Sequence, residues 1–333
     1  MFRTLMTNVC GAVLAASLLT TSATAADVTL RYAGTLQTTH HNTDGQYMFA
    51  KRVEELTKGS VKIEVYPAAQ LYKAREIPTA IISGGVDMGF NLTSVWSTDP
   101  VSEINDIPFL FKDAEHAGKA WAPDGPLFKA YAAEMDKKGL KTIHTMFYGS
   151  LFDFGNKGRQ LKDGPDFKGM KIRAYGKLSA EGLRALGASP VVMSPGEMYL
   201  AIQRGTIDGA ITGVTALQSR KIWEVVEYST ITGAAFGVMA VNISKAKWEG
   251  LSADQQEALL KAGDEVFQWS IGESAARDKS SLDFLIEKGV KTYVLTPEDK
   301  EKWRKLFGPA YDSWNSRASD EQKALVTWID SLR

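Results

Sequence analysis

The feature that most constrains the fold is a segment that occurs twice in the chain. Residues 76–87 can be laid on residues 197–208 at a constant offset, with Glu, Ala, Ile, Gly and Asp identical and Val86 facing Ile207. Each copy has the pattern of a helix, a glycine stop and a strand. The second copy also begins with a capping box, because Ser194 is followed by Pro195 and Glu197. We therefore expect each copy to form the same piece of a separate lobe.

The rest of the chain alternates between strand and helix patterns. Val61, Ile63 and Val65 alternate with polar residues, which is the period of a half-buried strand. Alternating strands and helices predict an α/β protein with mixed, mostly parallel sheets. The other expected strands span residues 86–92, 140–147, 170–175 and 190–193, and helices are expected over 179–186 and from 195.

The last third of the chain is mostly helical. Residues 253–288 predict either one long helix or two helices with a break near Gly272. A second helical stripe carries Trp303, Leu306, Phe307, Tyr311 and Trp314. We interpret these aromatic and apolar side chains as core or lobe-packing residues.

The first 25 residues have the pattern of a cleavable secretory signal peptide. Arg3 precedes a short apolar run over 13–19, and the small residues of 23–25 form a cleavage signal. A buried N-terminal helix is the less favoured alternative. No later apolar run reaches the roughly 18 residues of a membrane helix. The only cysteine, Cys10, lies in this segment, so the exported chain has no disulfide and no cysteine nucleophile or metal ligand. We expect a periplasmic protein.

Sequence patterns of catalysis are scarce. The chain has no Gly-Lys-Ser/Thr phosphate loop, no G-x-S-x-G elbow, no H-E-x-x-H and no EF-hand loop. It also lacks a basic block typical of nucleic-acid binding. His40 and His41 are adjacent, and neighbouring loop residues usually point apart, which disfavours a metal site. We expect no enzyme activity, no cofactor and no metal.

Arg173 is the candidate binding residue. In the strand over 170–175, Arg173 and Tyr175 share one face and the apolar residues the other. A guanidinium group near the carboxyl end of a strand can hold a carboxylate through two parallel hydrogen bonds. From spacing alone, a surface arginine on an edge strand is equally compatible. The strands after the repeated helices end at Asn91 and Thr212, and facing lobes would bring both to one cleft.

Several short motifs follow one another along the chain, at residues 49–53, 66–71, 107–111, 168–173, 197–203, 207–209 and 221–225. With these motifs in this order, the chain resembles the DctP-type extracytoplasmic solute-binding proteins of TRAP transporters. The resemblance implies two α/β lobes joined by crossing strands and a long helix, with a small organic acid and the transporter's membrane subunits as partners of a monomer. The expected lobes are 26–148 plus 238–278 and 149–237 plus 279–333.

The resemblance also assigns roles in the site. Arg173 matches the family arginine that forms a salt bridge to the ligand carboxylate. Leu151 stands where many members carry a second arginine, and Ile211 and Thr212 stand where many carry Glu-Asn. These replacements disfavour sialic acid and C4-dicarboxylates and predict a monocarboxylate, such as a 2-oxo, 2-hydroxy or aromatic acid. The expected apolar wall is Leu151, Phe152, Tyr175, Ile211 and Phe236, and the expected polar contacts are Asn91, Thr93, Thr212 and the loop 35–41 with His40.

The mechanism implied is hinge closure on the ligand, with no bond made or broken. Two alternatives stay open at this point. One is a ligand-sensing subunit of a membrane signalling protein, because no sequence signature marks the partner surface. The other is an exported enzyme on a two-lobed fold, which would need a nucleophile or an acid–base pair in the cleft.

Overall fold

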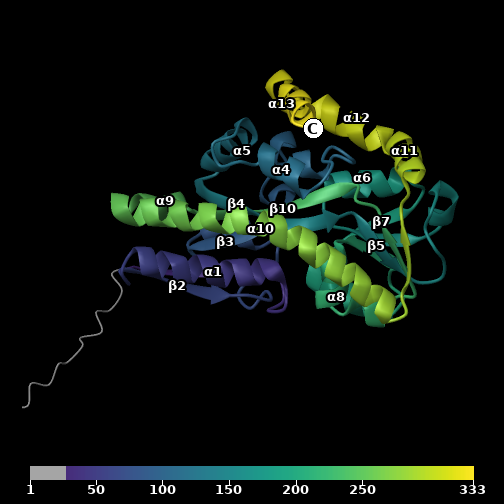
Figure 1. Ribbon diagram of the computed structural model, residues 1–333, viewed down its shortest axis with the longest axis horizontal. Helices are drawn as coiled ribbons and strands as arrows, with labels where there is room; N and C mark the ends of the chain where they lie inside the picture. The colour runs from purple at the N-terminus through teal and green to yellow at the C-terminus, as the bar shows by residue number, and fades with distance from the viewer. Residues whose placement is uncertain (1–27) are drawn as a thin grey trace, which may run out of the picture.

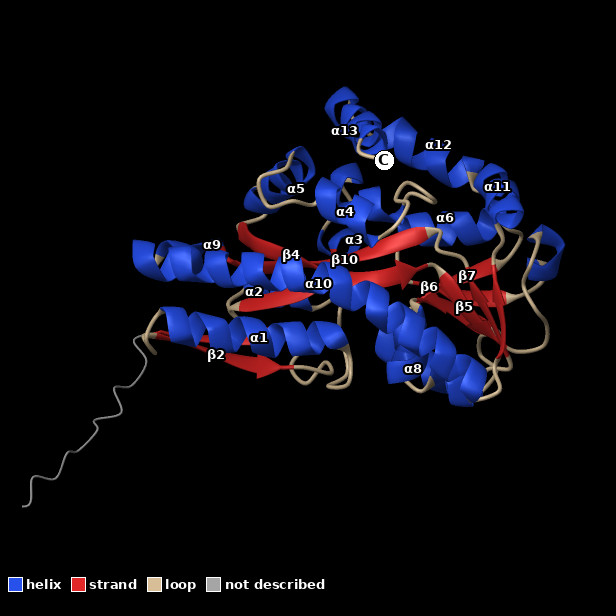
Figure 2. Ribbon diagram, viewed as in Figure 1, coloured by secondary structure: helices blue, strands red, loops and turns tan. Residues whose placement is uncertain are grey.

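The computed structural model describes residues 28–333, and the predicted signal peptide lies outside them. Two β-sheets flanked by helices form the molecule (Figures 1 and 2). The first sheet has the strand order β2-β1-β3-β10-β4. Its strands are β1 (Val28–Ala33), β2 (Val61–Tyr66), β3 (Met88–Leu92), β4 (Leu140–Leu151) and β10 (Ala235–Ser244). We call it sheet A.

The second sheet, sheet B, has the order β11-β9-β5-β8-β6-β7. The edge strand β7 contains Pro190, which cannot donate to a strand ladder and suits an edge. The strands are β5 (Asp153–Asn156), β6 (Lys171–Ala174), β7 (Ser189–Val192), β8 (Gly209–Thr212), β9 (Tyr228–Ile231) and β11 (Lys291–Val294).

Each sheet is mostly parallel with one reversed strand. In sheet A the reversed strand is β10, and in sheet B it is β5. Both reversals arise where the chain passes between the sheets, because β4 runs into β5 through Phe152 and β9 runs into β10 through residues 232–234. This architecture confirms the expected two-lobed α/β fold. The lobe boundaries stay a prediction.

Helix α10 (Ala253–Glu287) is continuous over 35 residues, so no break occurs at Gly272. It begins at a capping box in which Gln255 N–H donates to Ser252 Oγ and the Gln255 side chain accepts from Ser252 N–H. Figure 1 shows it crossing from sheet A to sheet B, past α1 and then α8. The helix therefore joins the two lobes along its whole length.

The remaining helices cover the two sheets. Within the described residues, no helix combines the length and apolar character that a membrane span requires. The helices are α1 (His41–Leu56), α2 (Ile77–Ile82), α3 (Thr93–Trp96), α4 (Ala114–Ala120), α5 (Pro126–Asp136), α6 (Lys177–Ala185), α7 (Met198–Gln203), α8 (Val214–Ser219) and α9 (Lys245–Glu249), and the 3₁₀ helices are η1 (Pro100–Asp106), η2 (Gly164–Phe167), η3 (Pro195–Glu197) and η4 (Ile222–Glu224).

The repeated segment forms equivalent pieces of the two sheets. α2 with β3 belongs to sheet A, and α7 with β8 belongs to sheet B. Asp87 accepts a hydrogen bond from the Arg31 N–H of β1 at 2.8 Å, and Asp208 accepts one from the Lys171 N–H of β6 at 2.7 Å. The repeated aspartate thus fastens the start of its strand to the neighbouring strand in both lobes.

The chain ends in α11 (Pro297–Leu306), α12 (Gly308–Arg317) and α13 (Asp320–Ser331), which lie along one side of both sheets (Figure 1). Trp303, Phe307 and Trp314 are fully buried, which confirms them as core residues. Leu306 is half-buried and Tyr311 is exposed. The Trp314 indole N–H donates to Pro100 O in η1 at 2.9 Å, so these helices also hold the first lobe.

Candidate functional site

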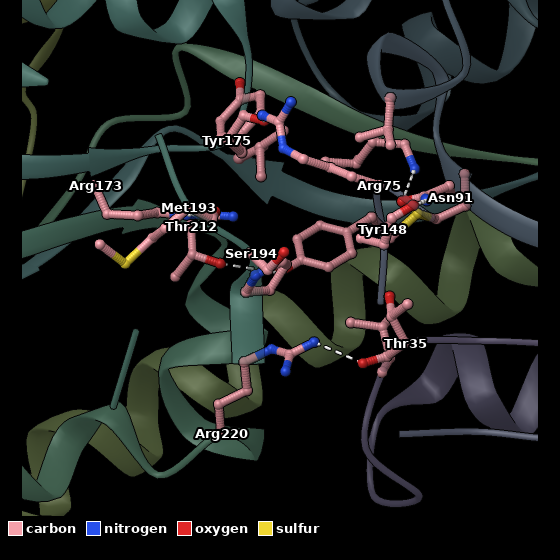
Figure 3. A pocket seen from close by; sticks show the side chains of 17 residues that line it. Thr35, Arg75, Asn91, Tyr148, Arg173, Tyr175, Met193, Ser194, Thr212 and Arg220 are labelled. Carbon is pink, nitrogen blue, oxygen red and sulfur yellow. Dashed lines mark hydrogen bonds between the residues drawn. The ribbon is translucent and has the colours of Figure 1, made fainter. Parts of the chain in front are cut away.

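A cavity lies between the carboxyl ends of the strands of the two sheets (Figure 3). The centre of a water-sized sphere can occupy about 40 Å³ of it, several times the roughly 10–15 Å³ that one water needs. It is therefore sized for a small molecule. Its walls are Thr35, Leu36, Ala74, Arg75, Asn91, Leu92, Val95, Tyr148, Leu151, Arg173, Tyr175, Met193, Ser194, Pro195, Thr212, Arg220 and Met239.

Arg173 is only 3% exposed and is held by backbone groups. Its Nε donates to Met193 O at 3.2 Å, and its Nη1 donates to Ile211 O at 2.7 Å. Strand β6 lies between β8 and β7, so the edge-strand alternative is wrong. The Nη2 group makes no hydrogen bond with any described residue and is available to a ligand.

Two further arginines line the cavity and connect the lobes. Arg220, just after α8, donates from Nη2 to Thr35 O in the loop between β1 and α1 at 2.9 Å (Figure 3). Arg75 donates from Nη2 to Tyr175 O at 3.0 Å. The buried Nε of Arg220 has no partner among the described residues. The cavity thus holds three guanidinium groups rather than the single charged anchor expected.

The electrostatics of the cavity favour an anion. In residues 28–333, no ion pair involves Arg75, Arg173 or Arg220, and no acidic side chain lines the cavity. Burial and the nearby charge of Arg220 together lower the pKa of Arg173 to about 10. The group still carries its charge at neutral pH. A buried cation without a counter-ion is costly, and a bound carboxylate would offset that cost.

The strand ends contribute polar groups of both lobes. Asn91 and Thr212 are equivalent positions of the repeat, and both line the cavity. The Asn91 amide donates to Ala74 O at 2.6 Å, and the hydroxyls of Thr212 and Tyr148 lie 3.4 Å apart. The apolar part of the wall includes Leu151, as expected.

Tyr175 lines the cavity and contacts the other lobe. Its hydroxyl donates to Asp106 Oδ1 at 3.3 Å. Burial raises the pKa of Asp106 to about 7. The pair forms a further polar contact between η1 and the end of β6.

Several predicted residues do not line this cavity, among them Ile211, which contributes only the backbone oxygen that accepts from Arg173 Nη1. The Thr93 hydroxyl accepts from Asn105 Nδ2 at 2.9 Å and is used inside its own lobe. Phe152 has a left-handed backbone (φ 76°) where the chain leaves β4, and its ring packs against Phe307 instead. The half-buried Phe236 packs edge-on against Phe147.

His40 also lies outside the cavity, behind Tyr148. Its ring stacks on His41 and on Tyr148, with centroids 4.5 and 5.1 Å away. Its Nε2 lies 3.2 Å from Thr215 Oγ1 across the lobes. Burial holds the pKa of His40 well below its usual range, and the charge of His41 adds to this. His40 is therefore a neutral interlobe contact.

Sequence reasoning missed Arg75, Arg220, Tyr148 and the segment 193–195. The repeated segment could have predicted part of the segment 193–195. Extended toward the amino terminus at the same offset, it aligns Ala74 with Pro195, and both line the cavity. No motif marks Arg220, which is carried by a short helix after β8.

The fold and this cavity define a two-lobed solute-binding protein with a cationic site between its lobes. The chain belongs to bacterial extracellular solute-binding protein family 7, the DctP family, whose model matches residues 32–317. This confirms the DctP-type, TRAP-associated resemblance.

Individual relatives cover most of the chain. The C4-dicarboxylate-binding periplasmic protein DctP of Rhodobacter capsulatus is 30% identical over 85% of each chain. The 2,3-diketo-L-gulonate-binding periplasmic protein YiaO of Escherichia coli is 29% identical over 80% of this chain and 81% of that protein. A succinate-bound TRAP periplasmic solute-binding protein of Sulfurospirillum deleyianum superposes with a TM-score of 0.84 at 26% identity, covering 92% of this chain and all of that one.

Proposed function

We propose that the chain captures a small organic acid in the periplasm and delivers it to the membrane subunits of a TRAP transporter. The observation that carries this proposal is the group of three guanidinium groups around one interlobe cavity. Among the described residues that line this cavity, none is acidic. The acids named for the relatives support the same class: C4-dicarboxylate, 2,3-diketo-L-gulonate and succinate. Arg173 is the carboxylate anchor.

The ligand we favour is a monocarboxylate, such as a 2-oxo or 2-hydroxy acid. Arg173 uses Nε and Nη1 for backbone oxygens and keeps Nη2 free, and Arg75 and Arg220 each use one nitrogen for an interlobe hydrogen bond. The unpartnered Nε of Arg220 would donate to the 2-oxygen of the acid. Leu151, Met193 and Met239 supply an apolar wall for the rest of the ligand.

A dicarboxylate is the second candidate, because Arg75 and Arg220 also suit a second acid group. The two candidates differ in a measurable way. A monocarboxylate site binds the monoacid at least as tightly as its dicarboxylate counterpart, whereas a dicarboxylate site loses most affinity when one acid group is removed.

Capture works by closure of the lobes. The ligand contacts residues of both lobes, so it binds the closed arrangement better than the open one and shifts the population toward it. The interlobe contacts of Arg75, Arg220 and Tyr175 form in the same arrangement. The closed surface is what the membrane subunits recognise.

The test combines ligand identification with an Arg173 variant. Mass spectrometry of acid released from the purified protein names the ligand, and thermal shift with 2-oxo, 2-hydroxy, aromatic and dicarboxylic acids ranks the classes. Arg173→Lys keeps the charge but loses the planar fork, so we expect about 10- to 100-fold weaker binding.

The matched control is Arg184→Lys, on the exposed face of α6, which should bind like the wild type. Circular dichroism checks that both variants fold. Unchanged affinity in Arg173→Lys would exclude Arg173 as the anchor. No thermal shift with any acid would sink the whole proposal.

A further inference from the structure

Two carboxyl groups lie where the chain passes from sheet A to sheet B, that of the half-buried Asp278 and that of the buried Asp153. Asp278, on α10, accepts a hydrogen bond from the Ser150 N–H near the end of β4 at 2.6 Å. Asp153 is the first residue of β5, and its Oδ1 accepts from the Thr232 N–H of the second crossing at 2.8 Å. The pair therefore spans both strand crossings and the helix that joins the lobes.

The packing leaves each acid with one unused oxygen. Oδ1 of Asp278 and Oδ2 of Asp153 are buried and have no partner among the described residues. Asp153 is fully buried. The Asp278 carboxyl lies against Gly149, where an added Cβ would come 2.5 Å from Oδ1. Buried acceptors of this kind are expensive to keep ionised.

The charges nearby do not compensate the pair. On α10, Arg277 is paired with Glu273 at 2.6 Å and Lys279 with Asp283 at 2.8 Å. In residues 28–333, no ion pair involves Asp153 or Asp278.

The neighbours from the other elements are backbone and hydroxyl groups. They are the N–H groups of Ser150 on β4, of Thr232 and Gly233 in the second crossing and of Val214 on α8, with the Ser150 hydroxyl.

These surroundings favour a bound proton. Burial and the charge of Asp153 together raise the pKa of Asp278 to about 8, against the Ser150 N–H bond. Burial likewise raises the pKa of Asp153 to about 6, against the bond from Thr232 N–H. In the closed arrangement Asp278 is therefore largely protonated at neutral pH.

We propose that the Asp278–Asp153 pair is a proton site of the hinge, which takes up one proton when the lobes close and releases it when they open. The inference rests on the hinge closure of the proposed function. Opening rotates the two sheets about Phe152 and the second crossing, so water reaches the two carboxyl groups. Hydration then lowers the free energy of their ionised forms.

The sign follows from proton linkage. The closed form holds the proton more tightly than the open one, so lowering the pH favours closure. The effect is largest below the ordinary pKa of an aspartate and is lost as the pH rises through about 8.

Two other interlobe groups also titrate. Asp106, facing Tyr175, acts in the same direction around pH 7, and His40 acts in the opposite direction below its usual pKa. Measurements between pH 7 and pH 9, with a variant of Asp278 alone, separate its share from theirs.

The experiment measures the ratio of closed to open protein without ligand. Fluorescent dyes are placed on Lys51→Cys in α1 and Arg204→Cys after α7, both exposed, in the exported chain that lacks Cys10. Single-molecule energy transfer is then recorded at pH 7 and pH 9. Asp278→Asn keeps an acceptor for the Ser150 N–H but cannot ionise, and Asp283→Asn is the exposed control on the same helix.

We expect the closed-to-open ratio of the wild type and of Asp283→Asn to rise about tenfold from pH 9 to pH 7. In Asp278→Asn the ratio should change about twofold or less and stay high at pH 9. An equal ratio at both pH values in the wild type, or an unchanged pH response in Asp278→Asn, overturns the proposal.

Urea unfolding gives a second readout without dyes, because the proton held in the closed form stabilises the native protein at pH 7. Asp278→Asn should gain stability relative to the wild type as the pH rises from 7 to 9, and a constant difference contradicts a titrating Asp278. If only this proposal fails, the same dyes still report closure of the lobes when an acid of the screen is added. If the proposed function fails, no acid of the screen closes the lobes.

Discussion

The Arg173 guanidinium is positioned by two carbonyl oxygens of the backbone, those of Met193 and Ile211. Both belong to neighbouring strands or their ends, so the register of sheet B sets the orientation of the charge. A lysine at this position would place a single ammonium without a fixed plane. The specificity of the site at this scale therefore depends on strand pairing as much as on the side chain itself.

The aromatic cluster under α11 yields a prediction about a single residue. Trp303 is fully buried, contacts Phe154, Phe167 and Phe307 edge-on, and donates to Lys162 O at 2.9 Å. Trp303→Ala should lower the free energy of unfolding by about 3–5 kcal/mol, because it leaves a cavity and an unpaired carbonyl.

The measurement is the urea unfolding midpoint. Tyr311→Ala, at an exposed position of the same stripe, should change the stability by about 0.5 kcal/mol or less. Equal losses in the two variants would contradict the assignment of Trp303 to the core.

At the scale of elements, several helices and strands could be predicted from local sequence patterns. The period of residues 61–66 and the repeated helix–glycine–strand segment predicted β2, α2, β3, α7 and β8, because each depends on neighbouring residues alone. Among site residues, Arg173, Tyr175, Leu151, Asn91 and Thr212 line the cavity. Strand ends or strand faces predicted Arg173, Asn91, Thr212 and Tyr175, whereas Leu151 was predicted from the family resemblance.

The remaining site residues could not be read in this way. Arg220 and Arg75 reach the cavity only because two lobes face each other, and no local pattern encodes that arrangement. Phe152 was expected in the apolar wall, but its backbone is left-handed between β4 and β5 and its ring packs on Phe307. Long-range packing decides these positions.

Helix α10 gives a prediction for its own stability. At Gly272 an added Cβ would meet no atom within 4 Å, so Gly272→Ala should stabilise the protein by up to about 1 kcal/mol through helix propensity. At Gly263 the Cβ would come 2.8 Å from the Cβ of His144, so Gly263→Ala should destabilise it by about 1–3 kcal/mol. Thermal unfolding of the two variants checks both signs, and a loss in Gly272→Ala would argue that the glycine bends the helix.

At the scale of the whole molecule, few direct bonds hold the lobes together over the cavity. Arg75 is exposed, and its bond to Tyr175 O is one of them. Arg75→Ala should weaken ligand binding about fivefold, mainly by faster release, since the closed arrangement loses roughly 1 kcal/mol.

Stopped-flow release of the identified acid measures this change, with the urea midpoint as the stability control. A slower association rate with unchanged release would instead assign Arg75 to the encounter step.

The interior place of β10 in sheet A has a consequence for biosynthesis. β10 pairs with β3 and β4, yet the ribosome makes it only after β5, β6, β7, β8 and β9 have emerged. Sheet A is therefore incomplete through most of translation, and its pairing closes a long loop, which slows folding. A chain that folds late stays unfolded for longer, and the unfolded state is the one in which a polypeptide can pass through a secretion channel.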